Sequence, residues 1–188
     1  LQRVKDKLIA ALNQHVDKGN TILDFGCGPG IYMKMLDKDY HVVGVDISDE
    51  MLQSASRLMP ENKFYCGDFL DIHYDERFSA IYSIGALEYI SVSRIHNFFK
   101  KCADILNPKG LLFIQYPHAV RIWDLFYPNL SYINYSPKLI SRIASRYFQV
   151  LENCQAFDGR PACWYDKHPY PTSTRIVKNG YLLIAKKK

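Results

Sequence analysis

The hydrophobic positions follow two alternating spacings along the chain. Short apolar runs bounded by turn residues predict buried strands at Thr21–Phe25, His41–Val45, Lys63–Cys66, Phe78–Ile84 and Gly110–Tyr116, with two later strands near Phe148–Phe157 and Tyr181–Lys186. Between the strands, apolar residues recur every three or four positions, which predicts helices over 1–16, 30–37, 48–58, 91–106 and from 136 onward. Strands that alternate with helices favour an α/β fold with a largely parallel sheet.

Turn and capping residues set the expected ends of these elements. Ser48 is a good N-cap for the third helix, and Ser91 is expected to cap the helix after the fourth strand. Asn107-Pro108 and Gly110 are expected to end that helix, so that the fifth strand begins at Gly110. The segment 67–77 is short for a full crossover helix.

Acidic residues stand at the carboxyl ends of the first four predicted strands. Asp24 lies near the end of the first strand and Asp46 directly follows the second, whereas Asp68 and Glu88 lie just beyond the third and fourth. Ligands of parallel α/β sheets bind at this edge. Because grouped carboxylates need compensation, a cationic ligand is favoured. For any one acid, a role as a helix cap or turn residue remains the alternative.

The segment "ILDFGCGPG" (22–30) combines a buried strand, an acid and closely spaced glycines. Its G-x-G-x-G spacing departs from the dinucleotide pattern G-x-G-x-x-G, because Ile31 occupies the third glycine position. Asp46, twenty residues after Gly26, suits the two hydroxyls of a ribose. Asp24 suits an ammonium group and the following helix a carboxylate. S-adenosylmethionine has all of these groups and a cationic sulfonium.

At this point the chain resembles the class I S-adenosylmethionine-dependent methyltransferases. The resemblance covers residues 20–117 closely and the last two strands loosely. It is carried by the segments "ILDFGCGPG" (22–30), "VVGVDISDEML" (42–52), "YCGDFLD" (65–71), "FSAIYSIGALEYI" (78–90) and "ILNPKGLLFIQYP" (105–117). It implies a Rossmann-like three-layer sandwich with a mostly parallel seven-stranded sheet, whose last strand is antiparallel.

The resemblance also implies which residues bind the cofactor, S-adenosylmethionine, and its product S-adenosylhomocysteine. These residues lie at or directly after the ends of the first four strands: Asp24, Gly26, Cys27, Gly28, Gly30, Asp46, Ile47, Met51, Asp68, Phe69, Ser83, Ile84 and Gly85. The group from Asp24 to Gly30 is expected to hold the methionine end, and Asp46 the ribose. Ile47 and Met51 are expected to pack on the adenine, and Asp68 with Phe69 to read its amino edge. Ser83, Ile84 and Gly85 are expected to line the cofactor near the reacting methyl. Cys27 is interpreted as a small filler of the turn rather than a nucleophile.

The family has no fixed catalytic residue, so candidates are taken from the segments after strands four and five: Glu88, Tyr116 and His118. His118 is the best general-base candidate because its ordinary pKa is about 6.5, although a solvated loop histidine is the alternative. Tyr89 stands where many relatives have His. The motif "SIGALEY" also differs from the N/D-P-P-Y motif of methyltransferases that act on nucleic-acid amines, which disfavours such a substrate.

Aromatic residues concentrate in residues 116–135, which we interpret as a substrate-cap insertion at 117–135 within a single domain of 1–188. An aromatic cap suits a small apolar or aromatic methyl acceptor. A satellite core is the alternative interpretation of this segment. Alternatives for the function are a methyltransferase acting on lipids or macromolecules, a non-catalytic S-adenosylmethionine-binding protein, and a nicotinamide oxidoreductase. Ile31 and Asp24 count against the oxidoreductase.

Composition and charge restrict the picture further. The 188 residues fit one domain, and the formal net charge of +5 does not by itself imply a nucleic-acid partner. Five cysteines without a C-x-x-C pair indicate reduced thiols in a cytoplasmic protein, and scattered histidines indicate no metal site. The amphipathic start lacks the apolar core of a signal peptide, and no apolar run is long enough to span a bilayer. The oligomeric state cannot be predicted from these features.

Overall fold

The computed structural model describes residues 2–118, 135–155 and 179–188. The strands are β1 Thr21–Phe25, β2 His41–Asp46, β3 Phe64–Cys66, β4 Phe78–Ile84, β5 Leu106–His118, β6 Phe148–Gln155 and β7 Asn179–Lys187. The helices are α1 Gln2–His15, α2 Ile31–Leu36, α3 Asp49–Leu58, α4 Ile95–Ile105 and α5 Pro137–Ala144, with a short 3-10 helix η1 at Leu87–Tyr89.

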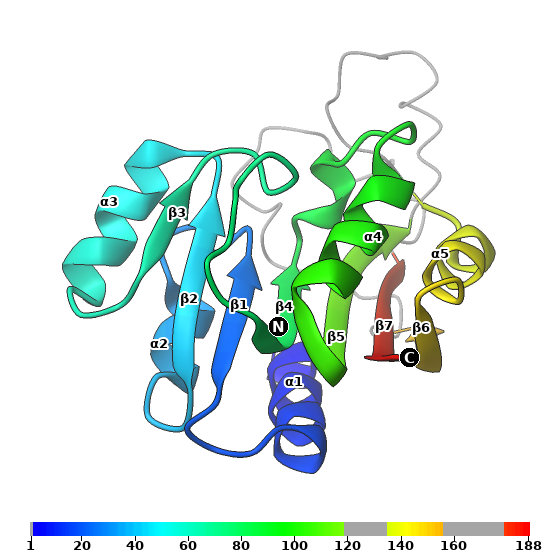
Figure 1. Cartoon of the computed structure of the whole chain (residues 1–188), viewed down its shortest axis with the longest axis horizontal. Helices are drawn as coiled ribbons and strands as arrows, with labels where there is room; N and C mark the ends of the chain where they lie inside the picture. Colours follow the sequence, from blue (N-terminus) through cyan, green and yellow to red (C-terminus); the bar gives the residue numbers. More distant parts are fainter. Residues whose placement is uncertain (1, 119–134, 156–178) are drawn as a thin grey trace, which may run out of the picture.

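The strands form one seven-stranded sheet in the order β3-β2-β1-β4-β5-β7-β6 (Figure 1). Strands β1 to β5 pair in parallel. Strand β7 lies between β5 and β6 and is antiparallel to both. The predicted α/β class and the single antiparallel last strand are therefore confirmed. From β1 the chain adds β2 and β3 toward one edge of the sheet, and from β4 it adds β5 toward the other edge. Sheets of this kind bind ligands in the crevice at the carboxyl ends of the two strands where the direction changes, here β1 and β4.

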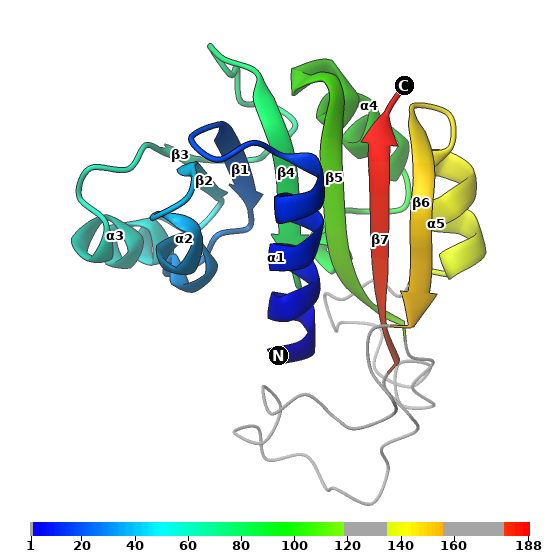
Figure 2. The same ribbon diagram turned by 90° about the horizontal axis from the view of Figure 1, so that it is seen from below.

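Helices cover the two faces of the sheet and give two hydrophobic cores. On one face, α4 and α5 bury residues such as Phe98, Phe99 and Ile140. On the other face, α1, α2 and α3 bury residues such as Leu8 and Met33 (Figure 2). Neighbouring strand residues alternate between these cores, as expected for a pleated strand. The result is the three-layer sandwich that the resemblance implied.

The capping prediction for α3 is confirmed and the one for α4 is wrong. The Ser48 hydroxyl accepts a hydrogen bond of 3.4 Å from the Met51 N–H at the start of α3. Helix α4 begins only at Ile95, because residues 91–94 form a separate turn in which the Arg94 N–H donates to the Ser91 carbonyl at 2.9 Å. Ser91 therefore closes that turn instead of capping the helix.

Strand β5 begins at Leu106, directly after α4, rather than at the predicted Gly110. Leu106 pairs with Phe78, and the register then shifts before Leu111. Lys109 adopts a left-handed conformation with φ 61° inside this irregular stretch. The Asn-Pro-Lys-Gly sequence that was expected to end the helix is thus absorbed as a bulge within the strand.

Candidate functional site

The turn that follows β1 depends on glycine for two different reasons. Gly26, Gly28 and Gly30 all have left-handed φ angles, of 73°, 52° and 81°. A Cβ on Gly26 would lie 2.3 Å from the Cβ of Ala86, whereas a Cβ on Gly28 would meet nothing within 4 Å. Gly26 therefore lets the turn pack against the segment after β4, and Gly28 leaves open space beside the turn.

Most N–H groups of this turn are already used within the protein. Those of Gly26 and Cys27 donate to the Val45 carbonyl, at 2.8 and 3.1 Å, and that of Gly30 donates to the Cys27 carbonyl at 3.0 Å. The N–H groups at the start of α2 have no partner inside the helix. They remain the predicted donors for a ligand carboxylate.

Asp46 ties the end of β2 to the glycine turn. Its Oδ2 accepts a 2.8 Å hydrogen bond from the Gly28 N–H, and its Oδ1 accepts a 2.9 Å bond from the Ser48 N–H. Each carboxylate oxygen can accept a further bond. The predicted ribose contact is thus compatible with the geometry, and Asp46 has a second task in holding the turn.

Asp24 is a buried carboxyl group at the end of β1, with only 3% of its surface exposed. Burial raises its pKa to about 8; the Tyr82 hydroxyl partly offsets this rise and the charge of Asp46 adds to it. No cationic side chain among the described residues contributes to this shift. A buried carboxylate without a cation is costly, so Asp24 fits a ligand that brings its own positive charge.

Several buried polar atoms lack a hydrogen-bond partner among the described residues: Tyr65 Oη, Tyr74 Oη, Tyr82 Oη, Ser83 Oγ and Glu88 Oε2. Three of the five lie on β4 or just after it. Buried polar groups are normally paired, by protein or by a bound molecule. Together with Asp24, the three atoms on or after β4 fit a polar ligand at the carboxyl ends of β1 and β4. The residues present therefore fit the amino-acid end of the predicted cofactor.

The predicted adenine side presents open apolar surface. Ile47 is 74% exposed and Met51 41% exposed, although both are apolar and lie directly after β2. Phe69 is different, because its ring is buried against Phe25 and Phe98 at centroid distances of 4.8 and 5.3 Å. Any ligand contact of Phe69 therefore has to come from its backbone rather than from its side chain.

Asp68 holds the loop after β3 in place. Its Oδ1 accepts a 2.9 Å bond from the Leu70 N–H, and its Oδ2 accepts a 2.6 Å bond from the Arg94 guanidinium. Burial acts to raise the pKa of Asp68, but the bonds from Arg94 and Leu70 outweigh it and lower that pKa. Asp68 is therefore ionised at neutral pH and remains a proposed acceptor for the adenine amino group.

Cys27 fills the inside of the glycine turn. It is buried, and its Sγ would lie 2.9 Å from a Cβ on Gly44, so only glycine fits on the neighbouring strand. Burial, together with the charges of Asp24 and Asp46, raises the pKa of the thiol far above its ordinary value. A thiol in this state is a poor nucleophile, in agreement with the interpretation of Cys27 as a filler.

Glu88 lies on η1, after the left-handed turn that Gly85 makes at φ 75°. Only 6% of its surface is exposed. Burial raises its pKa to about 7, an effect partly offset by a bond from its own backbone N–H. A carboxyl group that titrates near neutral pH can take or give a proton.

The other two catalytic candidates are Tyr116, whose side chain is described, and His118, of which only the backbone is described. Tyr116 is fully buried, and its hydroxyl donates to Asn153 Oδ1 at 2.9 Å, which joins β5 to β6. This contact is structural and gives no support to the predicted catalytic role. The backbone of His118 pairs with Asn179, but its side chain lies outside the described residues. Residues 119–134 of the predicted cap also lie outside them.

Two residues of this region were missed by sequence reasoning. Tyr82 is directly opposite Asp24 on the neighbouring strand, and period-two alternation would have placed it there once β1 and β4 were known to be adjacent. Arg94 is far from Asp68 in sequence, and no sequence pattern pairs them.

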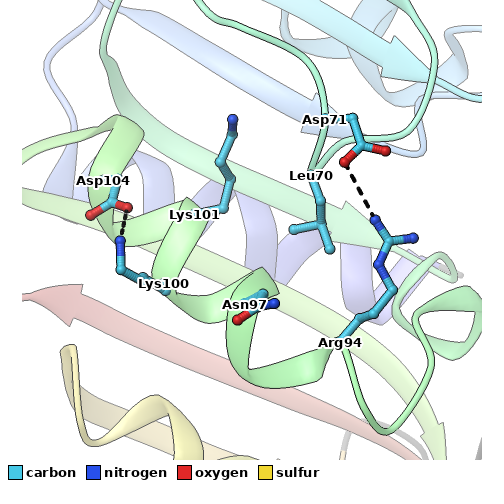
Figure 3. Close-up of a pocket in the computed structure, with 7 residues that line it drawn as sticks. All are labelled: Leu70, Asp71, Arg94, Asn97, Lys100, Lys101 and Asp104. Carbon is cyan, nitrogen blue, oxygen red and sulfur yellow. Dashed lines mark hydrogen bonds and ion pairs between the residues drawn. The ribbon is translucent and has the colours of Figure 1, made fainter.

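A hollow of about 410 Å³ lies between α4 and the loop that follows β3 (Figure 3). It is lined by Leu70, Asp71, Arg94, Asn97, Lys100, Lys101 and Asp104. Its charged groups are engaged with one another or with the backbone: Arg94 with Asp71 at 3.8 Å, Lys100 with Asp104 at 2.6 Å, and Lys101 with the Ile72 carbonyl at 2.7 Å. Because these charged groups already have partners, we assign no ligand to this hollow.

Neither a metal-binding group nor a membrane-spanning helix is found within residues 2–118, 135–155 and 179–188. No three His, Cys, Asp or Glu side chains there come together as a metal-binding group. No helix in the same ranges is both long and apolar enough to cross a membrane. The four described cysteines are free, and Cys163 lies outside the described part of the chain.

Comparison with known sequences gives matches to methyltransferases. Residues 22–110 match the family described as "Methyltransferase domain". The chain is 28% identical to sphingolipid C9-methyltransferase 1 of Gibberella zeae over 135 residues, which are 66% of this chain and 26% of that protein. It is 32% identical to trans-aconitate 2-methyltransferase of Yersinia pseudotuberculosis over 99 residues, 51% of this chain and 38% of that protein. The chain thus spans well under half the length of these curated relatives.

Comparison with solved structures agrees with the fold. The N-methyltransferase NodS from Bradyrhizobium japonicum, solved with S-adenosyl-L-homocysteine, superposes with a TM-score of 0.74 at 14% identity, covering 99% of this chain and 86% of that one. The cyclopropane synthase MmaA2 from Mycobacterium tuberculosis gives 0.71 at 19% identity, covering 80% and 62%. The domain match over residues 22–110 supports the resemblance to the class I S-adenosylmethionine-dependent methyltransferases, and these superpositions show that the chain has the fold of solved methyltransferases.

Proposed function

We propose that the protein transfers a methyl group from S-adenosylmethionine to a small apolar or aromatic molecule. The observation that carries the cofactor assignment is Asp24, a buried carboxyl without a cation beside the glycine turn. When bound, S-adenosylmethionine supplies an electrophilic methyl group on a positively charged sulfur. Asp24 binds the ammonium group, Asp46 the ribose hydroxyls, and Ile47 with Met51 one face of the adenine.

The acceptor side of the site is formed by the segment after β4. Tyr89 and Val92 follow Glu88 in sequence and are 57% and 61% exposed. They offer an apolar surface beside the group that titrates near neutral pH. This arrangement supports an acceptor that is held by apolar contacts and oriented for in-line attack on the methyl group.

Glu88 is our proposed proton acceptor for an acceptor molecule that must lose a proton. Its pKa of about 7 leaves a large ionised fraction at neutral pH, and its Oε2 has no protein partner among the described residues. Glu88→Gln is expected to lower kcat by about 10²–10⁴-fold while leaving the affinity for S-adenosylhomocysteine unchanged. Single-turnover rates and calorimetric titration measure the two effects separately. Unchanged kcat in Glu88→Gln would remove Glu88 from the mechanism and leave His118 as the candidate.

A lipid acceptor is the second candidate, favoured by the match to a sphingolipid C9-methyltransferase. The two are separated by incubating the protein with methyl-labelled S-adenosylmethionine and, in parallel, a small-molecule extract, a lipid extract and a macromolecular fraction. We expect label in low-mass products of the first extract and none with Asp24→Asn. Label in the lipid extract alone supports the second candidate. Label in protein or nucleic acid contradicts both, and binding without any transfer indicates a non-catalytic binding protein.

A further inference from the structure

Tyr82 of β4 stands beside the proposed cofactor site, although no role was predicted for it within the segment "FSAIYSIGALEYI" (78–90). We propose that Tyr82 is a positioning residue, whose hydroxyl holds and orients the ionised Asp24 carboxylate toward the ammonium group of the cofactor. This inference rests on the proposed function, because it assumes that Asp24 binds that ammonium group.

The sheet register places the two side chains together. Asp24 and Tyr82 are direct neighbours on the parallel strands β1 and β4. Both residues are buried, with exposures of 3% and 0%, and Tyr82 packs in the core on the α1 face of the sheet. Strand geometry therefore fixes the tyrosine ring next to the carboxyl group, with few rotamers open to it.

The Tyr82 hydroxyl is a buried polar group without a hydrogen-bond partner in the described part of the chain. Its Oη makes no hydrogen bond of full geometry with any described residue. It nevertheless lies close enough to Asp24 to lower the pKa of that carboxyl. Leaving a buried hydroxyl unpaired is unfavourable, so a small movement that completes the bond from the Tyr82 hydroxyl to ionised Asp24 stabilises the carboxylate.

The remaining groups that act on Asp24 cannot replace this donor. Asp46 on β2 adds negative charge and makes ionisation of Asp24 harder. Cys27 in the turn and Tyr32 on α2 both have raised pKa values, first through burial and then through the charge of Asp24. Neither contributes to the shift of Asp24 itself. Tyr82 is thus the hydroxyl that favours the ionised form, which is the form that binds an ammonium group.

The test is the pH dependence of S-adenosylhomocysteine binding, measured by calorimetry from pH 6 to 9. Tyr82→Phe is expected to bind about tenfold more weakly at pH 7, the usual effect of losing a hydrogen bond to a charged group. The pH at which the affinity for S-adenosylhomocysteine falls to half of its maximum should also be higher in Tyr82→Phe, because Asp24 then holds its proton more tightly. Tyr116→Phe is the matched control, since Tyr116 is equally buried but bonded to Asn153. Its profile should equal that of the wild type.

Asp24→Asn separates this inference from the proposed function. If Asp24→Asn binds as well as the wild type, the cofactor-site assignment itself fails. If Asp24→Asn binds weakly but Tyr82→Phe keeps the wild-type affinity and pH profile, only the role of Tyr82 is overturned. In the Asp24→Asn background, Tyr82→Phe should add no further loss. This double variant carries no buried charge at position 24, so it serves even if Tyr82→Phe alone folds poorly. A further loss of affinity in the double variant would overturn the inference.

Discussion

Asp24 shows how a single residue can lower the stability of the fold while it makes a binding site. Its carboxyl group lies inside the sheet, where burial raises its pKa from 3.8 to about 8. A group whose folded pKa is raised above its unfolded value stabilises the fold when protonated. That stability is fully present below about pH 4 and is lost as the pH rises toward 8. The cation of a ligand then compensates the charge that the free protein leaves unpaired.

Asp24→Asn is therefore expected to stabilise the free protein at alkaline pH. At pH 8.5 the variant should unfold at a higher temperature than the wild type, by at least about 1 kcal/mol or roughly 2–4 °C for a chain of this length. The gain should shrink at pH 5.5 and vanish near pH 4. Thermal unfolding followed by circular dichroism at the three pH values measures it. A wild type that is more stable than Asp24→Asn at pH 8.5 would contradict the buried, uncompensated charge.

Sequence reasoning at the scale of residues succeeded where a position follows from strand ends. Asp24, Asp46 and the glycines of the turn lie at the carboxyl edge because parallel strands share that edge. Phe69 and Tyr116 were harder to place, because the orientation of a side chain near a strand end depends on what packs above it. Phe69 turns into the aromatic core and Tyr116 under α5, and neither orientation is encoded in local spacing.

At the scale of elements, the site depends on two turns that fit into each other. The turn after β1 and the segment after β4 approach so closely that a Cβ on Gly26 would overlap that of Ala86. The glycine loop is therefore shaped by its neighbour as well as by its own φ angles. A larger side chain in either turn therefore changes the packing of both turns.

Gly26→Ala is expected to destabilise the protein more than Gly28→Ala. Both introduce a left-handed alanine, which costs about 1–2 kcal/mol, but only Gly26→Ala adds overlap with Ala86, worth about 1–3 kcal/mol more. Adding Ala86→Gly should recover part of the loss for Gly26→Ala and none for Gly28→Ala. Denaturant unfolding of the single and double variants checks this. Equal losses of unfolding free energy in Gly26→Ala and Gly28→Ala would show that the close approach of Gly26 to Ala86 does not affect stability.

The extent of most elements was predictable, but their junctions were not. β1 and β4 have the predicted bounds, because each is a mostly apolar run between turn residues. The start of α4 at Ile95 and the start of β5 at Leu106 were not predicted. In both places a local signal, Ser91 or Asn107-Pro108, was used by a turn or a bulge that only the tertiary packing selects. The number of strands and the antiparallel last strand were implied by the family resemblance and not by periodicity, and the order of the strands in the sheet was not predicted.

For the whole molecule, the ligand and the fold are coupled because the site joins four strands and the turns that follow them. S-adenosylhomocysteine at about 100 times its Kd should raise the unfolding free energy by about 2.7 kcal/mol. For a chain of this length that is roughly 5–11 °C in Tm. NAD at the same concentration should produce no shift, which thermal unfolding monitors directly. A shift with NAD and none with S-adenosylhomocysteine would contradict the cofactor assignment.

The position of β7 has a consequence for the order in which the protein is made. β1 to β5 pair with strands that are synthesised close to them, whereas β6 has no neighbour in the sheet until Asn179–Lys187 has been added. On the ribosome, the cofactor half of the sheet can assemble while residues 156–178 are still being translated. During that interval one edge of β5 and both edges of β6 are open to other chains. Strand β7 therefore closes the sheet, and the nascent protein is most prone to aggregate in the interval before Asn179–Lys187 has been added.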